Sequence, residues 1–319
     1  MALSLAESAK LSTTNLQRGV IETFVQESSI LDRIPLLPIE GNAYAYNEES
    51  ALPGVAFRSV NEAYTESTGT VNQKSESLVI LGGDADVDRF IVQTRGNLND
   101  QRAVQTRMKV KAAAYKFQET FFNGDVATDA KSFDGLRKRL TGAQVISAGT
   151  NGAPIVGDGL GNDSHAFFDK LDELVATVPG LSSANGAIYA NRKVISKIKS
   201  AARRLGGYEM VNETLTGKWV PTYNGIALLD PGQTAAGADI LPQTETAGTA
   251  NDASSIYAVR FGQTEDDQAV TGLTNGGVMV DDLGQLETKP AYRTRIEFYC
   301  GLAVFGGRAA ARLNGVLAK

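Results

Sequence analysis

The chain has 319 residues, including 33 glycines, one cysteine and one histidine, and its formal net charge at pH 7 is −5. With 42% hydrophobic and 21% charged residues, it has the composition of a globular protein of one large domain or two ordinary ones. The single cysteine excludes an intrachain disulfide and a cysteine-rich zinc site, and the single histidine excludes a multi-histidine metal site. We therefore expect no catalytic, cofactor or metal site, and also no membrane span or signal peptide.

The charge is unevenly distributed along the chain. Residues 1–96 carry 7 basic and 13 acidic side chains, residues 97–140 carry 9 and 5, and residues 141–319 carry 15 and 18. The corresponding net charges of −6, +4 and −3 sum to the total of −5. An acidic front followed by a basic segment therefore requires a structural explanation.

The first third of the chain predicts a helix at 13–27, because its apolar residues recur on one helical face, and then an extended arm containing Pro35 and Pro38. Alternation of Tyr44 and Tyr46 with small residues predicts a β-hairpin at 43–64, with a turn at Pro53-Gly54. This hairpin is so polar that it must pack on the body of the protein or lie on another chain.

A short apolar run at 78–81 predicts a buried strand that Gly82-Gly83 would end. Asp84, Asp86 and Asp88 follow with strand periodicity, which places their acids on one face. A calcium loop starting there would need Gly at position six and Glu at position twelve, where this chain has Arg89 and Arg95. A solvated strand face is thus favoured over a calcium site.

Residues 98–123 predict the longest helix, with Val104, Met108, Ala112, Tyr115 and Phe122 along one apolar stripe and basic side chains on its flanks. The remainder alternates strands and helices, which indicates an α+β fold. Its predicted elements are a strand at 144–146, a helix capped by Ser164 and ending near 178, a strand at 187–190, a helix capped by Asn191 and ending near 205, a surface loop at 233–254, and strands at 256–261 and 295–304.

Few residues suggest a catalytic or ligand-binding site. Cys300 falls on the apolar face of the last strand, which favours a structural role, and His165 at a helix start has no evident nucleophile beside it. The glycine-rich stretch 157–161 lacks the spacing of a nucleotide-binding loop. The basic helix at 192–204 has no acidic residue and could bind phosphate, although a solvated face is the more common reason for such a pattern.

Several short segments, in a consistent order along the chain, resemble major capsid proteins of tailed double-stranded DNA bacteriophages, the Hong Kong 97-type capsid family. The segments that carry this resemblance are 41–47, 52–58, 60–62, 64–69, 82–89, 121–125, 133–136 and 295–313.

This resemblance implies an α+β fold with an N-terminal arm, a long hairpin called the E-loop, a peripheral domain with a spine helix, and an axial domain. In this chain we expect the arm at 1–39, the E-loop at 40–76, the peripheral domain at 77–140 and 286–319 with the spine helix at 98–123, and the axial domain at 141–285. In such shells the E-loop lies across the neighbouring subunit.

The resemblance also implies a function. The chain would self-assemble as hexamers and pentamers into the icosahedral head of a virion that encloses double-stranded DNA. Its partners would be a separate scaffolding protein, a portal protein, a possible decoration protein and the packaged DNA, and it would be made in the host bacterial cytoplasm. The alternatives are an encapsulin-like compartment shell and, from another class, a cytosolic α+β enzyme.

We hypothesise that the acidic E-loop docks on basic residues of an adjacent subunit, such as those of the spine helix. The candidate contact residues are Tyr44, Tyr46, Phe57, Arg58, Glu62, Glu66, Arg107 and Lys111.

Overall fold

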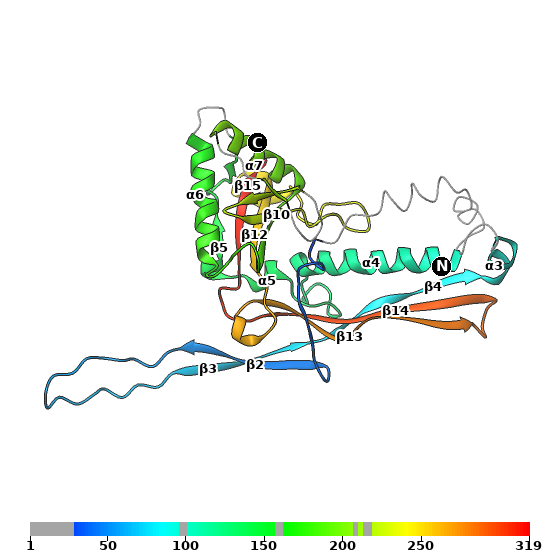
Figure 1. Ribbon diagram of the computed structural model, residues 1–319, viewed down its shortest axis with the longest axis horizontal. Helices are drawn as coiled ribbons and strands as arrows, with labels where there is room; N and C mark the ends of the chain where they lie inside the picture. The colour runs from blue at the N-terminus through cyan, green and yellow to red at the C-terminus, as the bar shows by residue number, and fades with distance from the viewer. Residues whose placement is uncertain (1–28, 96–100, 157–161, 207–209, 213–218) are drawn as a thin grey trace.

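The computed structural model describes residues 29–95, 101–156, 162–206, 210–212 and 219–319. It consists of an upright part, a long horizontal part and a hairpin that leaves their junction in the direction opposite to helix α4 (Figure 1). The predicted helix at 13–27 and the glycine-rich stretch 157–161 lie outside the described residues.

The helices are α3 (Arg89–Arg95), α4 (Gln101–Asn123), α5 (Leu136–Arg139), α6 (Asn162–Thr177) and α7 (Arg192–Arg204), with 3₁₀ turns at Gly142–Gln144 and Glu265–Asp267. The strands are β1 (Leu36–Pro38), β2 (Ala43–Ala51), β3 (Thr70–Ser77), β4 (Val79–Asp88), β5 (Val145–Ser147), β6 (Ala153–Pro154), β7 (Gly186–Tyr189), β8 (Met210–Asn212), β9 (Trp219–Tyr223), β10 (Ile226–Leu229), β11 (Glu245–Ala247), β12 (Ala250–Arg260), β13 (Val270–Gln285), β14 (Ala291–Val304) and β15 (Ala310–Leu317).

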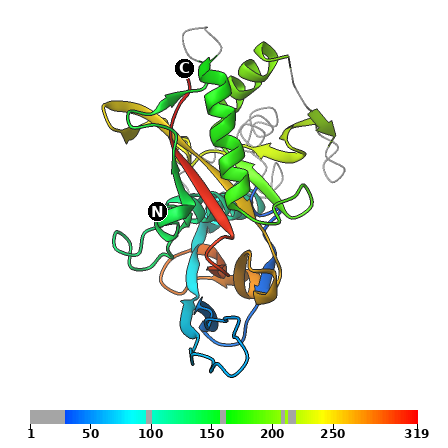
Figure 2. The same ribbon diagram turned by 90° about the vertical axis from the view of Figure 1, so that its left-hand side faces the viewer.

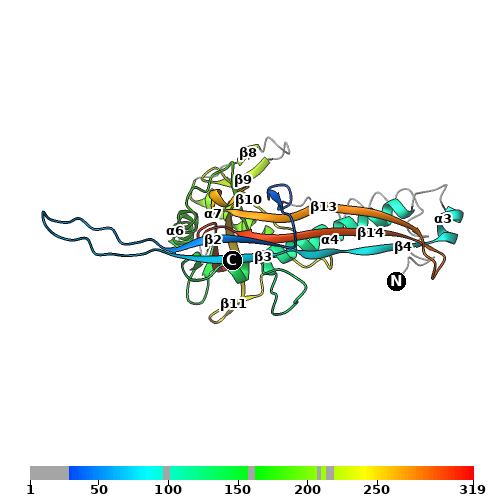
Figure 3. The same cartoon turned by 90° about the horizontal axis from the view of Figure 1, so that it is seen from below.

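The horizontal part is a four-stranded sheet in the order β1-β13-β14-β4, with α4 along one face (Figures 1 and 3). The alternation predicted for the strand at 295–304 is confirmed over 295–300, where Ile296, Phe298 and Cys300 of β14 are buried and Glu297 and Tyr299 are half-buried. It fails at the end of the strand, because residues 301–303 are all buried and Val304 is half-buried. The expected turn at Gly82-Gly83 is wrong, since β4 runs straight through both residues. A Cβ on Gly82 would lie 2.2 Å from the Ile296 carbonyl oxygen, so this glycine permits a close approach of β14 instead of a turn.

The acids of β4 lie on one strand face, as predicted, but Asp84 and Asp86 are paired with cations. Asp86 is opposite Arg293 on β14, and the guanidinium donates to both carboxylate oxygens at 2.7 and 2.8 Å. Lys289 adds a second cation at Asp86, and Arg295 donates to Asp84 at 2.9 Å. The expectation of a simply solvated face is therefore wrong for Asp86, whose side chain is only 10% exposed.

The upright part is a nine-stranded sheet whose main path is β5-β15-β12-β7-β10-β9-β8, with α6 and α7 against one face (Figure 2). Alternate residues of strand β12 pack into two different hydrophobic clusters, one on each face of the sheet. Ile256 and Ala258 pack with α6 and α7, whereas Tyr257 and Val259 point to the opposite face and pack in the cluster that contains α4. Both faces of the sheet are therefore covered at these central strands, and residues 256–259 of β12 are apolar in sequence.

Helix α4 confirms the predicted long helix, and its 23 residues give a length of about 35 Å. The predicted apolar stripe is only partly correct, because Met108 is 40% exposed. Burial concentrates at the C-terminal end, where Phe117, Phe121 and Phe122 are almost completely buried. The reason is that this end lies between the two sheets, whereas the rest of the helix runs along the four-stranded sheet.

The predicted hairpin at 43–64 is wrong in its pairing. Strand β2 pairs with β3, in a register that runs from Ala43 opposite Ser77 to Ala51 opposite Thr70. Beyond the strands the two arms continue side by side, because the Ser67 hydroxyl donates to the Gly54 carbonyl oxygen. The turn lies between Ser59 and Glu62, where Asn61 takes a left-handed conformation, and Pro53-Gly54 is part of one arm.

Further differences concern the remaining elements. Helix α3 was not predicted, and α6 begins at Asn162, so that Ser164 lies inside the helix with its hydroxyl donating to the Ile155 carbonyl. The expected surface loop at 233–254 contains β11 and the start of β12, and its Ile240 is buried. The Asn191 cap is confirmed, since its side chain accepts a hydrogen bond from the backbone N–H of Lys193.

The expected domain boundary at 285/286 does not follow the sheets. Strand β13, expected in the axial domain, pairs with β14 in the four-stranded sheet. Strand β15, expected in the peripheral domain, pairs with β12 and β5 in the nine-stranded sheet. The C-terminal segment from β14 to β15 therefore crosses from one sheet to the other.

Replacing Gly82 with alanine tests the close approach of β4 and β14. We expect Gly82→Ala to lower the free energy of unfolding by about 1–3 kcal/mol, because the added Cβ must displace the Ile296 carbonyl. Gly307→Ala is the matched control, since a Cβ there would approach only the Glu48 carboxylate, at 4.0 Å. Equal effects of the two changes in urea unfolding would contradict this explanation.

The cations around Asp86 predict a pH-dependent stability. Hydrogen bonds from Arg293, together with Lys289, hold the pKa of the Asp86 carboxyl well below its ordinary value of 3.8. A lowered carboxyl pKa stabilises the folded state above the unfolded-state pKa, and this contribution is lost as the pH falls below about 4. Wild type should therefore exceed Asp86→Asn in stability at pH 7, and thermal unfolding should show that difference shrinking towards pH 3. The exposed Asp266→Asn serves as control, and a difference independent of pH would argue against the cation pairing.

Candidate assembly interface

The most exposed part of the described chain is the hairpin tip, residues 52–69 between β2 and β3. It extends well beyond both sheets (Figure 3). Four of its apolar side chains are almost fully accessible, at exposed fractions between 77% and 107%: Leu52, Val55, Phe57 and Val60. Burying such side chains is favourable by about 25 cal/mol per Å² of apolar surface, so covering the tip with another molecule would be stabilising.

The tip is ordered by its own contacts. The Arg58 guanidinium lies over the Tyr64 ring at 5.2 Å and donates to the carbonyl oxygens of Ser59 and Glu62. The Glu62 carboxylate accepts the Ser59 backbone N–H at 2.9 Å. Two of the charged candidates, Arg58 and Glu62, are therefore engaged within the turn, while Glu66 is exposed.

The base of the hairpin is clamped to the body by an ion pair. The Arg139 guanidinium on α5 makes two parallel hydrogen bonds to the Glu76 carboxylate on β3, at 2.5 and 2.7 Å. Both side chains are less than 20% exposed, so solvent screens this pair less than a surface pair. A second pair, Lys74 with Glu48, links the two strands and is more exposed.

Aromatic packing also fixes the base. The Tyr46 ring meets the Phe305 ring edge-on at 4.9 Å, and its hydroxyl donates to the Val304 carbonyl oxygen. Burial, with nearby Glu76, raises the pKa of Tyr46 to about 12, and a hydrogen bond to Glu265 raises the pKa of Tyr44 to about 12. Tyr46 is 5% exposed and Tyr44 packs on the same Phe305, so both rings stabilise the base of the hairpin within one chain. Their expected contact with another subunit stays a prediction.

The remaining candidates lie on α4. Arg107 is exposed and Lys111 is half-buried. Figure 1 shows that α4 and the hairpin tip extend in opposite directions from the junction. The structure therefore does not bring these cations near the acidic tip within one chain, and only contact between copies could join them.

Sequence reasoning missed Arg139 and Phe305, which fix the hairpin, and it missed Leu52, Val55 and Val60 at the tip. Apolar residues within an otherwise polar hairpin were the available signal for the tip. No local pattern could indicate Arg139, because it lies 63 positions from its partner Glu76.

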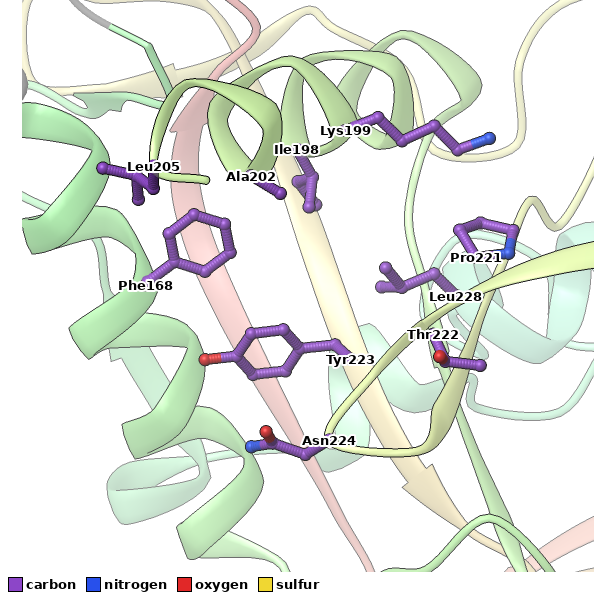
Figure 4. A pocket seen from close by; sticks show the side chains of 10 residues that line it. All are labelled: Phe168, Ile198, Lys199, Ala202, Leu205, Pro221, Thr222, Tyr223, Asn224 and Leu228. Atoms are coloured by element: carbon purple, nitrogen blue, oxygen red, sulfur yellow. The ribbon is translucent and has the colours of Figure 1, made fainter. Parts of the chain in front are cut away.

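A cavity of about 270 Å³ lies in the upright part between α6, α7 and the β9–β10 turn (Figure 4). Phe168 and Tyr223 stack in it with ring centroids 5.7 Å apart, and the Tyr223 hydroxyl donates to Asp172. Burial and Asp172 raise the pKa of Tyr223. Its ten lining residues include no carboxylate, histidine or cysteine, so they offer little for acid–base or nucleophilic chemistry.

Other candidate residues are placed as follows. Cys300 is buried in the core, and burial raises the pKa of its thiol to about 12, which suits a structural residue. His165 is exposed on α6. Among the described residues, no three His, Cys, Asp or Glu side chains group as metal ligands, and no helix combines the length and apolarity needed to cross a membrane.

The fold is the Hong Kong 97-type capsid fold, as the resemblance implied. Over 100% of this chain and 98% of the other, it is similar to the holo-SrpI encapsulin from Synechococcus elongatus PCC 7942, with 19% identity and a TM-score of 0.66. It is similar to the capsid of a native GTA particle, with 14% identity, coverage of 92% and 91%, and a TM-score of 0.65. It is also similar to the capsid of Cyanophage P-SCSP1u, with 16% identity, coverage of 92% and 89%, and a TM-score of 0.56.

Part of the sequence also matches the model of a protein family. Residues 13–165, a little under half of the chain, match the family described as major capsid protein GP7. Comparison with curated protein sequences finds no significant match. The family match includes the whole hairpin and α4, and together with the fold it confirms the resemblance to phage major capsid proteins.

The clamp at the hairpin base predicts a measurable coupling. We expect a double-mutant cycle of Glu76→Gln and Arg139→Gln to give a coupling free energy of about 1–3 kcal/mol, together with faster amide hydrogen exchange in β3. The matched control is the cycle of Lys74→Gln and Glu48→Gln, where the more exposed pair should give less than about 1 kcal/mol. Equal coupling in the two cycles would show that the Arg139 clamp has no special role.

Proposed function

We propose that the chain is the major capsid protein of a phage-like particle, which self-assembles as hexamers and pentamers into an icosahedral head that encloses double-stranded DNA. The observation that carries this proposal is the projecting hairpin. Its base is locked to the body by Glu76, Arg139 and Tyr46, while its apolar tip contacts nothing else in the described chain. A segment held rigidly away from its own body, with apolar side chains at its end, is suited to overlap a neighbouring copy.

The structure favours an apolar contact over the electrostatic one that the charge asymmetry suggested. Glu48 and Glu76 are paired with cations of the same chain, and the Glu62 carboxylate is used inside the turn. Phe57 and Val55 are exposed instead. The apolar residues of the tip therefore supply the main contact, and the charges contribute to solubility and orientation.

The proposal includes further partners in the roles that a DNA-filled head requires. A separate scaffolding protein would guide assembly, a portal protein would occupy one vertex, and a decoration protein could bind the outside. In this proposal the subunit has no catalytic role and acts through repeated weak contacts that sum over many copies. The head would form in the cytoplasm of a host bacterium.

An encapsulin-like shell is the second candidate, supported by the similarity to the holo-SrpI encapsulin over nearly the full length of both chains. The match of residues 13–165 to the capsid protein family favours the phage head. The contents of purified particles distinguish the two, because a phage head holds DNA and a compartment shell holds protein cargo. A cytosolic enzyme, the third alternative, would form no closed particles at all.

Assembly of the purified protein tests the proposed contact. We expect electron microscopy to show closed shells for wild type, and Val55→Asp/Phe57→Asp to give folded but unassembled subunits, because the charged tip cannot be buried. Val126→Asp, at another partly exposed valine, is the matched control and should still assemble.

The same assay separates the two kinds of contact. If apolar burial dominates, Glu62→Lys/Glu66→Lys shells should persist at both low and high salt. Loss of shells in that variant, with assembly retained in Val55→Asp/Phe57→Asp, would show that charges dominate instead. If wild type forms only small dispersed particles, the proposed function is wrong.

A further inference from the structure

Helix α7 presents an unusually basic surface at the end of the upright part, away from the hairpin (Figure 1). Its thirteen residues include six lysines and arginines and no acid. The only other polar side chains are Ser196 and Ser200. This local charge of +6 contrasts with the net charge of −5 of the whole chain.

The helix is strongly two-sided. Val194, Ile195, Ile198 and Ala201 are buried against the nine-stranded sheet and α6. Figure 4 shows Ile198 and Ala202 directed towards the rings of Phe168 and Tyr223. The cations occupy the other face, where Arg192, Lys193, Arg203 and Arg204 are exposed and Lys197 and Lys199 are half-buried.

At 100° per residue the cations fall into two rows. Arg192, Lys199 and Arg203 form one row, and Lys193, Lys197 and Arg204 form the other, with Ser196 and Ser200 between them. Each row spans about 16 Å along the helix axis, at 1.5 Å per residue. Duplex DNA presents about ten phosphate charges over that length, at one charge per ~1.7 Å.

Five of the six cations have no acidic partner among the described residues. Arg192 forms an ion pair with Asp230 at 3.2 Å. No ion pair is found in the described part of the chain for the others: Lys193, Lys197, Lys199, Arg203 and Arg204. Elsewhere the acids of the front segment, such as Glu48, Glu76 and Asp86, are already paired within the chain. Among the described residues the charge of this face is therefore largely uncompensated, and a polyanion such as duplex DNA is its complementary partner.

We infer that the basic face of α7 lies on the inner surface of the shell and contacts the phosphate backbone of the enclosed duplex DNA. This inference rests on the proposed function and assigns one surface of the subunit to its cargo. The contact is independent of base sequence, because lysine and arginine side chains on one exposed helix face read charge only. The two serines between the rows can donate hydrogen bonds to phosphate oxygens.

Crosslinking of DNA-filled particles tests the location directly. After mild formaldehyde treatment and nuclease digestion, mass spectrometry should find nucleotide adducts at Lys193, Lys197 or Lys199. The exposed Lys131 should remain unmodified by nucleotide. Adducts at Lys131 with none on α7 would overturn the inference, and this measurement needs no variant to fold.

A salt titration tests the mechanism on the unassembled subunit, with a 30-bp duplex of mixed sequence as the probe. Lys193→Gln/Lys197→Gln/Arg204→Gln should lower the slope of log affinity against log salt by about 2.7, or about 0.9 for each lost phosphate contact. The matched control, Arg89→Gln/Lys131→Gln/Arg308→Gln, removes three exposed cations elsewhere and should leave the slope near that of wild type. Equal slopes in the two variants would overturn the inference.

The failure of this inference is distinguishable from failure of the proposed function. Shells that form and retain DNA normally in the α7 variant, with an unchanged salt slope, would leave the capsid function intact and remove the role of α7. Absence of shells in wild type would remove the capsid function, whereas the salt titration would still measure the α7 surface. If the triple variant is misfolded by circular dichroism, Lys197→Gln alone should still lower the slope by about 0.9.

Discussion

The arrangement of the molecule depends on the aromatic end of α4. Phe122 packs on Tyr189 and Tyr257 of the nine-stranded sheet, while Phe117 packs on Phe298 of the four-stranded sheet. Buried aromatic side chains contribute large apolar areas and preferred edge-on or tilted contacts, so this end of the helix sets how one sheet stands on the other. The direction of the hairpin follows, because its base is attached to α5 and to the end of β14, which join the same cluster.

The side chains at the base of the hairpin contact the body of the same chain, whereas those at its tip are exposed. The base of the hairpin is held by the ion pair between Glu76 and Arg139 and by the packing of Tyr44 and Tyr46 on Phe305. The tip keeps its apolar residues exposed. In the proposed shell, this rigid attachment would lower the entropy lost when the tip docks, and modest apolar contacts would sum over many copies.

The charge asymmetry of the sequence has an explanation within one chain. Asp84 and Asp86 of β4 face arginines on β14, some 200 positions later, and Glu76 faces Arg139. Part of the acidic front is thus compensated by cations from distant segments, and the hypothesis that the rest docks on a neighbour stays a prediction. The basic helix α7 receives no such compensation in the described chain apart from the pair with Asp230, and for this reason it is the surface that we assign to DNA.

The sequence alone determined the elements whose signal is local: the long helix α4, the Asn191 cap of α7, the burial of Cys300 in an alternating strand, and the family that the short segments resemble. Tertiary structure decided everything that depends on distant partners. Gly82 looked like a turn because glycine often makes one, but here the approach of β14 requires it. Tyr46 looked like an interface residue, but Phe305 buries it. Residues 43–51 pair with β3, and the hairpin turns at Ser59–Glu62 and not at Pro53-Gly54. The residues of a strand do not by themselves determine which other segment forms hydrogen bonds with it.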